Sequence, residues 1–240
     1  MSKKLVEITG LTKNYGGLKA LDDVNISLES GRIIGLLGPN GSGKTTLIKI
    51  LNGLLRPSEG EVLIDGEKPG AYTKSVISYL PDRMYFADWM SVNDMMDFFG
   101  DFYEDFDRER AEKMCGLLGI SLKSKMKTLS KGTKEKVQLI LVMSRRAKLY
   151  LLDEPIAGVD PAARDYILNT IVSNYSEDST VLISTHLISD IENILDEIVF
   201  INMGVVTRHD TVDNIREQTG MSVDELFRNE FRTVPFQGVE

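Results

Sequence analysis

Cysteine and histidine are scarce in this sequence. Cys115 is the single cysteine among 240 residues, so an internal disulfide is excluded. Cys115 falls within a helical pattern and is expected to be a buried filler. The two histidines are His186 and His209. A chain of this length can instead be held together by a sizeable apolar core.

Long apolar runs and a surplus of basic residues are missing as well. No run approaches the roughly 18–20 residues that span a bilayer, and the residues after Met1 lack the apolar stretch of a signal peptide. Acidic residues outnumber basic ones, 36 to 28, which gives a net charge of −8. This balance disfavours a general nucleic-acid-binding role. We therefore expect a cytoplasmic protein that has no nucleic-acid partner.

The composition that is present, with 42% hydrophobic and 27% charged residues, is typical of a globular protein. Segments that alternate apolar and polar residues predict half-buried strands of a small antiparallel layer. Continuous apolar runs predict a parallel sheet that is covered on both faces, in an α/β core. The alternating segments are 5–9, 24–28 and 61–66, and the continuous runs are 33–37, 149–152 and 181–184.

The middle of the chain has a different pattern. From about residue 84 to 145, apolar residues recur at helical spacing, which predicts a helical subdomain inserted into the α/β core. We expect one domain over residues 1–232. Asp160, followed by a proline, predicts a helix start, and a capping box at 222–225 predicts a last short helix. The tail, 233–240, is expected to be loose.

The most specific motif is G-x-x-x-x-G-K-[ST] at residues 38–45. It follows the apolar run 33–37 and precedes a helical pattern over 44–54, which is the strand–loop–helix context of a phosphate-binding loop. Lys44 should reach the β- and γ-phosphates, and the Thr45 hydroxyl should ligate Mg²⁺. The alternative is a glycine-rich turn that matches by chance, and both flanks argue against it. The nucleotide-binding residues expected here are Gly38, Asn40, Gly41, Ser42, Gly43, Lys44, Thr45 and Thr46.

Two adjacent carboxylates end the apolar strand predicted over 149–152. Asp153 is placed to hold Mg²⁺ through its water shell, and Glu154 can act as the base for an attacking water. Such a pair could also form an ordinary turn. Together with the phosphate loop upstream, the pair indicates a site that hydrolyses a nucleoside triphosphate.

A second apolar strand, over 180–183, also ends in polar residues, among them His186. A neutral imidazole at this position could contact the γ-phosphate and orient the attacking water. A histidine that only caps or packs is the alternative. His209 has no such context, and we assign it no role.

These motifs together resemble those of ABC transporter ATP-binding subunits, over nearly the whole chain. The specific match is 129–133, which is similar to the family signature L-S-G-G-Q. The Walker B end at 153–155, the D-loop at 157–160 and the switch histidine segment at 184–186 follow in the family's order, and Tyr15 matches the aromatic that stacks on adenine. The resemblance implies a P-loop NTPase (RecA-like) core with an N-terminal antiparallel β layer and a helical subdomain.

The resemblance also implies partners. In this family two ATPase subunits, as a homodimer or a heterodimer, face each other head to tail, and the signature of one closes over ATP held by the other. Ser130 and Gly132 would supply that contact, and Asp160 would lie beside the nucleotide. A separate integral membrane permease is implied as well. It would dock on the apolar, aromatic-rich residues 84–90, for which a place in the core of the helical subdomain is the alternative.

Three positions depart from the family pattern. Lys131 and Thr133 stand in the signature where the family has glycine and glutamine, and Asp82 stands where it has glutamine or sometimes glutamate. In the family this last position contacts Mg²⁺ and the attacking water. Because Asp is shorter than Glu by a methylene and is charged unlike Gln, we expect a weaker or water-mediated Mg²⁺ contact at Asp82.

The leading hypothesis is a subunit that hydrolyses ATP, dimerises on ATP and powers a separate permease at the inner face of the cell membrane. Its departures and size look most like exporter-type bacterial subunits for drugs, peptides or lipid-type substrates. One alternative is a soluble ABC-type ATPase that acts on ribosomes or nucleic acid. Another is a non-hydrolysing regulatory module, against which Glu154 argues. The residues expected at the reaction centre are Lys44, Asp82, Glu154 and His186 for catalysis, and Thr45, Asp82 and Asp153 for the metal.

Overall fold

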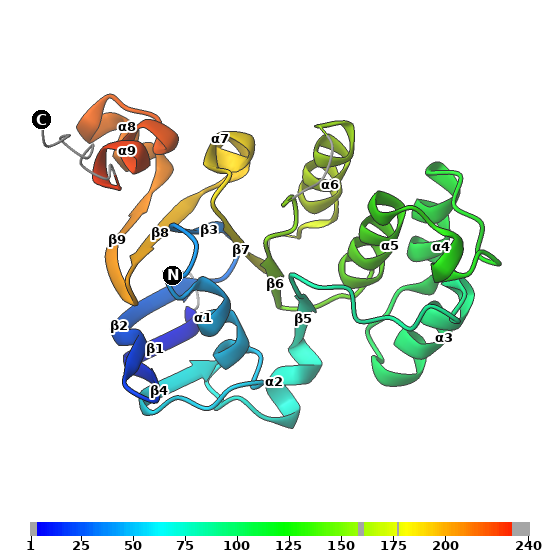
Figure 1. Cartoon of the computed structure of the whole chain (residues 1–240), viewed down its shortest axis with the longest axis horizontal. Helices are drawn as coiled ribbons and strands as arrows, with labels where there is room; N and C mark the ends of the chain where they lie inside the picture. Colours follow the sequence, from blue (N-terminus) through cyan, green and yellow to red (C-terminus); the bar gives the residue numbers. More distant parts are fainter. Residues whose placement is uncertain (1–3, 158–160, 177, 232–240) are drawn as a thin grey trace, which may run out of the picture.

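Two sheets form the framework of the chain in the computed structural model, which describes residues 4–157, 161–176 and 178–231 (Figure 1). One is a three-stranded antiparallel sheet with the order β2-β1-β4, and the other has six strands in the order β5-β6-β7-β3-β8-β9. The strands of the first are β1 (Lys4–Tyr15), β2 (Leu18–Glu29) and β4 (Glu59–Ile64), and those of the second are β3 (Ile33–Leu37), β5 (Ile77–Leu80), β6 (Leu149–Asp153), β7 (Thr180–Thr185), β8 (Glu197–Asn202) and β9 (Val205–Thr211).

The six-stranded sheet is parallel except at β9, which pairs antiparallel with β8. Every residue of β3, β6 and β7 is buried, which explains why these strands are continuous apolar runs. Leu151 faces a core shared with α1 and the antiparallel sheet, whereas Leu152 faces the opposite core. The helices are α1 (Lys44–Leu51), α2 (Ala71–Val76), α3 (Val92–Phe102), α4 (Arg108–Leu117), α5 (Lys131–Met143), α6 (Pro161–Asn174), α7 (Ile188–Ile191), α8 (Val212–Thr219) and α9 (Val223–Glu230).

Helices α3, α4 and α5 form a helical lobe at one end of the molecule, away from the antiparallel sheet (Figure 1). They pack around a buried cluster of their own that contains Phe99 and Cys115, so the expected buried position of the cysteine is confirmed. Side-chain caps set where these helices begin: Ser91, Asp107 and Ser130 each accept a hydrogen bond from a backbone N–H of the first turn.

A buried arginine fastens the helical lobe to the sheet. The Arg145 side chain donates to the Asp105 carboxylate at 2.9 and 3.1 Å, to the Ser75 carbonyl at 2.6 Å and to the Ile77 carbonyl. Its guanidinium also lies 3.7 Å from the centre of the Tyr103 ring. Each of these contacts offsets the cost of burying a charge. Arg145 thereby joins the lobe to the start of β5.

The predicted fold class is confirmed, but several strands are longer or additional. The strands expected at 5–9 and 24–28 extend over β1 and β2, because Gly10 and Asp23 have positive φ angles and interrupt the alternation without ending the pairing. The expected helix 44–54 ends at Leu51. Strands β5, β8 and β9 were not predicted.

The chain end is described only in part. The helix expected after Asp160 begins at Pro161, and the last helix is capped by Ser222, which accepts from the Glu225 N–H at 3.1 Å. Asp160 itself and the tail 233–240 lie outside the described residues. In the described ranges no helix is both long enough and apolar enough to cross a membrane.

Candidate nucleotide site

The phosphate-loop motif lies where it was expected, between the carboxyl end of β3 and the start of α1. A side chain at Gly38 would place its Cβ 2.2 Å from the Ile201 carbonyl oxygen, and one at Gly43 would lie 2.5 Å from the Ala20 carbonyl oxygen. Gly43 also has a φ of +114°, which L-residues rarely adopt. These two positions therefore require glycine, because a side chain at either would clash with a neighbouring backbone carbonyl.

Lys44 is buried at the base of this loop. Its ammonium group donates to the carbonyl oxygens of Gly38 at 2.8 Å and Pro39 at 3.1 Å and lies 3.6 Å from Glu154 Oε1. Burial lowers the pKa of Lys44, while the carboxylates of Glu154 and Asp153 oppose this shift. Two neutral carbonyl oxygens and the Glu154 carboxylate thus hold the ammonium inside the loop, and phosphate oxygens would be stronger acceptors than the carbonyls.

Asp153 ends β6 beside the phosphate loop. Its Oδ1 accepts from Ser184 Oγ at 2.6 Å and from Thr45 Oγ1 at 3.1 Å. Its Oδ2 is buried and has no hydrogen-bond partner in the described part of the chain. Burial, and after it the charges of Asp82 and Glu154, raises the pKa of Asp153.

These groups fit a magnesium ion. Mg²⁺ prefers hard oxygen donors and is usually held by one or two side-chain oxygens together with water and phosphate. Asp153 offers a buried carboxylate oxygen without a partner, and Thr45 offers a hydroxyl next to it. A cation here would also relieve the cost of burying the Asp153 charge.

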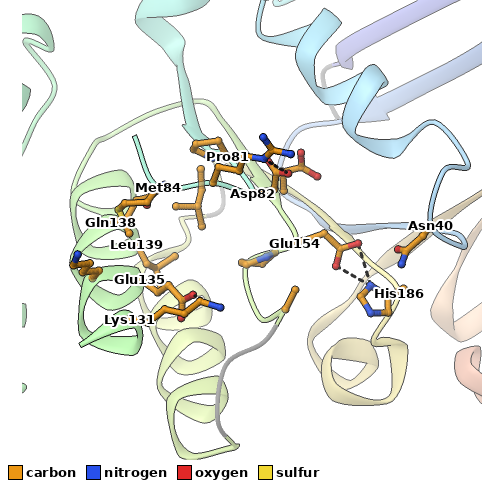
Figure 2. Close-up of a pocket in the computed structure, with 16 residues that line it drawn as sticks. Asn40, Pro81, Asp82, Met84, Lys131, Glu135, Gln138, Leu139, Glu154 and His186 are labelled. Carbon is orange, nitrogen blue, oxygen red and sulfur yellow. Dashed lines mark hydrogen bonds and ion pairs between the residues drawn. The ribbon is translucent and has the colours of Figure 1, made fainter. Parts of the chain in front are cut away.

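Glu154 follows in a strained turn. Its φ is +52°, which is uncommon outside glycine. The turn is fixed because its N–H donates to the Ser184 carbonyl at 3.0 Å. The Glu154 carboxylate lies 3.1 and 3.2 Å from His186 Nδ1, as Figure 2 shows. The two expected catalytic side chains thus touch, and the histidine orients the carboxylate.

Two cavities meet at this edge of the sheet. A cavity of about 290 Å³ is lined by the phosphate loop together with Asp82 and Glu154. A larger one, about 540 Å³, lies between the sheet edge and α5, with Lys131 across from His186 (Figure 2). Asp82 lines both cavities. It is half-exposed and lies 3.8 Å from the Arg83 guanidinium.

Most of the loop residues expected to bind nucleotide line the smaller cavity. Ser42 Oγ is buried there without a partner among the described residues. Ser184 was not predicted as part of the site. It could have been found from the strand register, since it pairs with Asp153 at the end of the neighbouring strand. The expected residues that line this cavity are Asn40, Gly41, Ser42, Gly43, Lys44, Thr45, Thr46, Asp82 and Glu154.

The signature residues and Tyr15 lie apart from this cavity. Ser130 caps α5 by accepting from the Thr133 N–H at 3.2 Å, and its hydroxyl lies 2.8 Å from the Thr133 hydroxyl. Neither Ser130 nor Gly132 lines the smaller cavity. Tyr15 ends β1, is 44% exposed and carries the Lys13 ammonium 5.0 Å from its ring centre. Their contacts with nucleotide remain predictions.

Fold and site together define a P-loop nucleoside triphosphatase: a parallel sheet, a glycine loop that leads into a helix, and a strand-end carboxylate bonded to the Thr45 hydroxyl. The sequence pattern of the family described as "ABC transporter" matches residues 21–157. The chain belongs to this family. It is an ATP-binding subunit of the ABC transporter class and an ATPase.

Individual relatives agree with this assignment. The chain is 32% identical over 217 residues to the ABC transporter ATP-binding protein YtrB of Bacillus subtilis, which covers 89% of this chain and 74% of YtrB. It is 28% identical over 221 residues to the SkfA peptide export ATP-binding protein SkfE of the same organism, with 90% and 92% covered. A solved ATP-binding subunit of an ABC transporter superposes with a TM-score of 0.85 at 28% identity, covering 94% of this chain and 98% of that one.

Proposed function

We propose that this chain hydrolyses ATP at the edge of the six-stranded sheet, with Glu154 as the general base. The observation that carries the proposal is the contact set of the adjacent carboxylates. Asp153 is bonded to Thr45 and Ser184 and keeps one buried oxygen without a partner in the described ranges. The carboxylate of Glu154, the next residue, lies 3.1 Å from His186 Nδ1. Neighbouring residues can therefore divide metal binding and proton transfer between them.

Each side chain acts on a different group of ATP or on the attacking water. Lys44 exchanges the carbonyl oxygens of Gly38 and Pro39 for phosphate oxygens, which are stronger acceptors. Thr45 and Asp153 would hold Mg²⁺, which when bound offsets negative charge on the phosphates. Glu154 accepts the proton of the attacking water.

The remaining expected residues complete the nucleotide site. His186 holds the Glu154 carboxylate in place. The backbone N–H groups at the start of α1 face the phosphates, with the positive end of the helix dipole behind them. Tyr15 stacks on the base.

The second half of the site would come from another ATPase subunit, either a second copy of this chain or a related one. The signature residues Ser130 and Gly132 lie at the start of α5, where a helix N-terminus attracts an anion. Both lie outside the phosphate-loop cavity of their own chain. ATP bound to one subunit, beside its Asp160 and its phosphate loop, would thus be closed over by the signature of the other.

The ATPase would drive a separate integral membrane permease from the inner face of the membrane. A groove of about 490 Å³ lies between β5 and the helical lobe and is lined by several aromatic side chains, among them Tyr85 and Phe99. Trp89 nearby in sequence is 68% exposed. Such a surface fits a short amphipathic helix of the permease. Export of a drug, peptide or lipid-type substrate is the proposed direction, and the likeness to the peptide-export protein SkfE supports it.

The test of the proposed reaction is ATP turnover by Glu154→Gln. Removing the base should slow hydrolysis about 10²–10⁴-fold, roughly 3–5.5 kcal/mol of barrier, and ATP binding should remain. The matched control is Glu217→Gln, because Glu217 is an exposed glutamate on α8, away from the site. Unchanged turnover in Glu154→Gln would refute the assigned base.

A further inference from the structure

Four buried side-chain atoms in the described part of the chain have no hydrogen-bond partner: Ser42 Oγ, Tyr79 OH, Gln138 Nε2 and Asp153 Oδ2. Buried polar groups without a partner are rare in native proteins, so each one requires an explanation. Phosphate and Mg²⁺ account for Ser42 and Asp153 in the proposed reaction. Tyr79 has no such explanation, although it lies on the strand next to Asp153.

The strand register places Tyr79 beside the metal position. Tyr79 pairs with Leu151 in the parallel pairing of β5 and β6. Because side chains alternate along a strand, Leu151 and Asp153 point to the same face of the sheet. Tyr79 packs in the same core as Leu151, on the face that carries α1 and Thr45. Tyr79 and Asp153 therefore lie on the same face of neighbouring strands, and the charge of Asp153 acts on the Tyr79 phenol.

The phenol of Tyr79 is a hydrogen-bond donor in this setting. Burial, followed by the negative charges of Asp153 and Asp82, raises the pKa of Tyr79. The hydroxyl therefore keeps its proton at neutral pH. Around it lie two carboxylates. Asp153 accepts two hydrogen bonds on Oδ1, and its Oδ2 is the oxygen assigned to Mg²⁺ in the proposed function.

Asp82 is the second carboxylate whose charge acts on this donor. It follows Tyr79 by three residues, and both line the aromatic groove of about 490 Å³. Asp82 also lines the phosphate-loop cavity, so it sits where the two hollows meet. Its side chain is 37% exposed, and the exposed Arg83 guanidinium at 3.8 Å holds it only weakly.

We propose that Tyr79 is a positioning residue for ATP hydrolysis, whose hydroxyl donates to the Asp82 carboxylate when Asp82 turns into the phosphate-loop cavity. This inference rests on the proposed function. One oxygen of Asp82 is held by the phenol, and the other faces the water shell of the metal position. The Tyr79 hydroxyl, which has no acceptor among the described residues, then gains the Asp82 carboxylate as its acceptor when nucleotide binds.

The test is a double-mutant cycle with Tyr79→Phe, Asp82→Asn and the double variant of the full chain. Each single change should lower kcat about tenfold, the effect of losing one hydrogen bond to a charged group, and should raise the Mg²⁺ concentration needed for half-maximal rate. Affinity for ATP, measured without turnover, should stay within about twofold of wild type because neither residue is proposed to hold the phosphates. The double variant should be no slower than the slower single variant, because both changes remove the same contact.

Tyr79→Phe is expected to fold normally, since it deletes a buried hydroxyl that has no partner in the described residues. The control is Tyr72→Phe, because the Tyr72 hydroxyl donates to Asp65 at 2.5 Å, away from the nucleotide cavities. Its rate and Mg²⁺ dependence should match wild type.

Two results would overturn the inference: a Tyr79→Phe variant with the kcat and Mg²⁺ dependence of wild type, or a double variant whose loss is the product of the two single losses. Glu154→Gln separates this failure from that of the proposed function. If Glu154→Gln stops turnover while Tyr79→Phe behaves as wild type, only the role of Tyr79 is wrong. If the wild-type chain does not hydrolyse ATP, the role of Tyr79 falls with the function on which it rests.

Discussion

Two regions of the chain differ in how their polar side chains are hydrogen-bonded: the phosphate-loop edge, which contains Ser42 and Asp153, and the signature turn at 129–133. At the phosphate-loop edge, Ser42 Oγ and Asp153 Oδ2 are buried without partners in the described ranges. At the signature turn, the exposed Ser130 hydroxyl is already bonded to the N–H and hydroxyl of Thr133. The first region is unsatisfied until a ligand arrives, whereas the second is complete as an ordinary helix cap.

This difference indicates how each region contributes to function. Unsatisfied buried groups lower the stability of the ligand-free chain and are characteristic of functional sites. A helix cap stabilises the chain whether or not it later touches a phosphate. The ligand-free chain should therefore become more stable when an unsatisfied group at the phosphate-loop edge is removed. It should become less stable when the helix cap at the signature turn is removed.

The largest expected effect is on ATP affinity. In Lys44→Ala the phosphates lose their buried ammonium partner, which should weaken ATP binding by about 2–3 kcal/mol, roughly 30- to 150-fold. Titration of a fluorescent ATP analogue would measure this. Lys49→Ala, on the same helix but outside the phosphate-loop cavity, is the control. Equal affinities for Lys44→Ala and wild type would show that the loop does not hold the phosphates.

Tyr15 tests how far the nucleotide extends from the phosphate loop. It lies at the end of β1 and does not line the loop cavity. If it stacks on the base, Tyr15→Ala should cost on the order of 1–3 kcal/mol of affinity, as aromatics do on bases. Tyr15→Phe keeps the ring and should bind normally. Should the alanine variant bind as tightly as wild type, the base lies elsewhere.

Asp153→Asn tests whether the buried carboxylate at the phosphate-loop edge lowers the stability of the folded chain. The folded pKa of Asp153 lies above its unfolded value of about 3.9, so ionisation of this group disfavours folding. This penalty is absent below the unfolded pKa and develops as pH rises through the folded pKa. Without Mg²⁺, the asparagine variant should be more stable than wild type at pH 7 and equal to it near pH 3.

Urea unfolding at the two pH values would measure this difference. Addition of Mg²⁺ and ATP should stabilise wild type and should have much less effect on Asp153→Asn. A variant that is less stable than wild type at pH 7 would mean that its hydrogen bonds with Ser184 and Thr45 outweigh the buried charge.

Ser130→Ala tests the signature turn, where the expected effect is small. Loss of the N-cap of α5 should destabilise the chain by about 1 kcal/mol at any pH. Ser130→Asn, which keeps a capping side chain, should restore most of that stability. An alanine variant as stable as wild type would show that the cap contributes nothing and would remove the contrast with Asp153.

The sequence was sufficient to predict the fold class, and it placed the expected site residues at the ends of buried strands. For that reason Lys44 and Glu154 lie close together, with 3.6 Å between Nζ and Oε1. Their roles in catalysis stay predictions. The side chains that contact the site and join the helical lobe to the sheet were harder to predict from the sequence. Ser184 reaches Asp153 only through the register of two strands that are distant in sequence. Arg145 joins the helical lobe to β5, which the pattern did not reveal as a strand.

The central claim is that ATP is bound between the phosphate loop of one subunit and the signature turn of another. The most direct test is sedimentation of Glu154→Gln with and without Mg²⁺ and ATP, because loss of the base should preserve the ATP-bound state. The variant should be a monomer without ATP and a dimer with it, and Ser130→Arg in the same background should abolish the dimer. A Glu154→Gln chain that binds ATP but remains monomeric at every ATP concentration would show that the signature turn does not close over ATP held by another subunit.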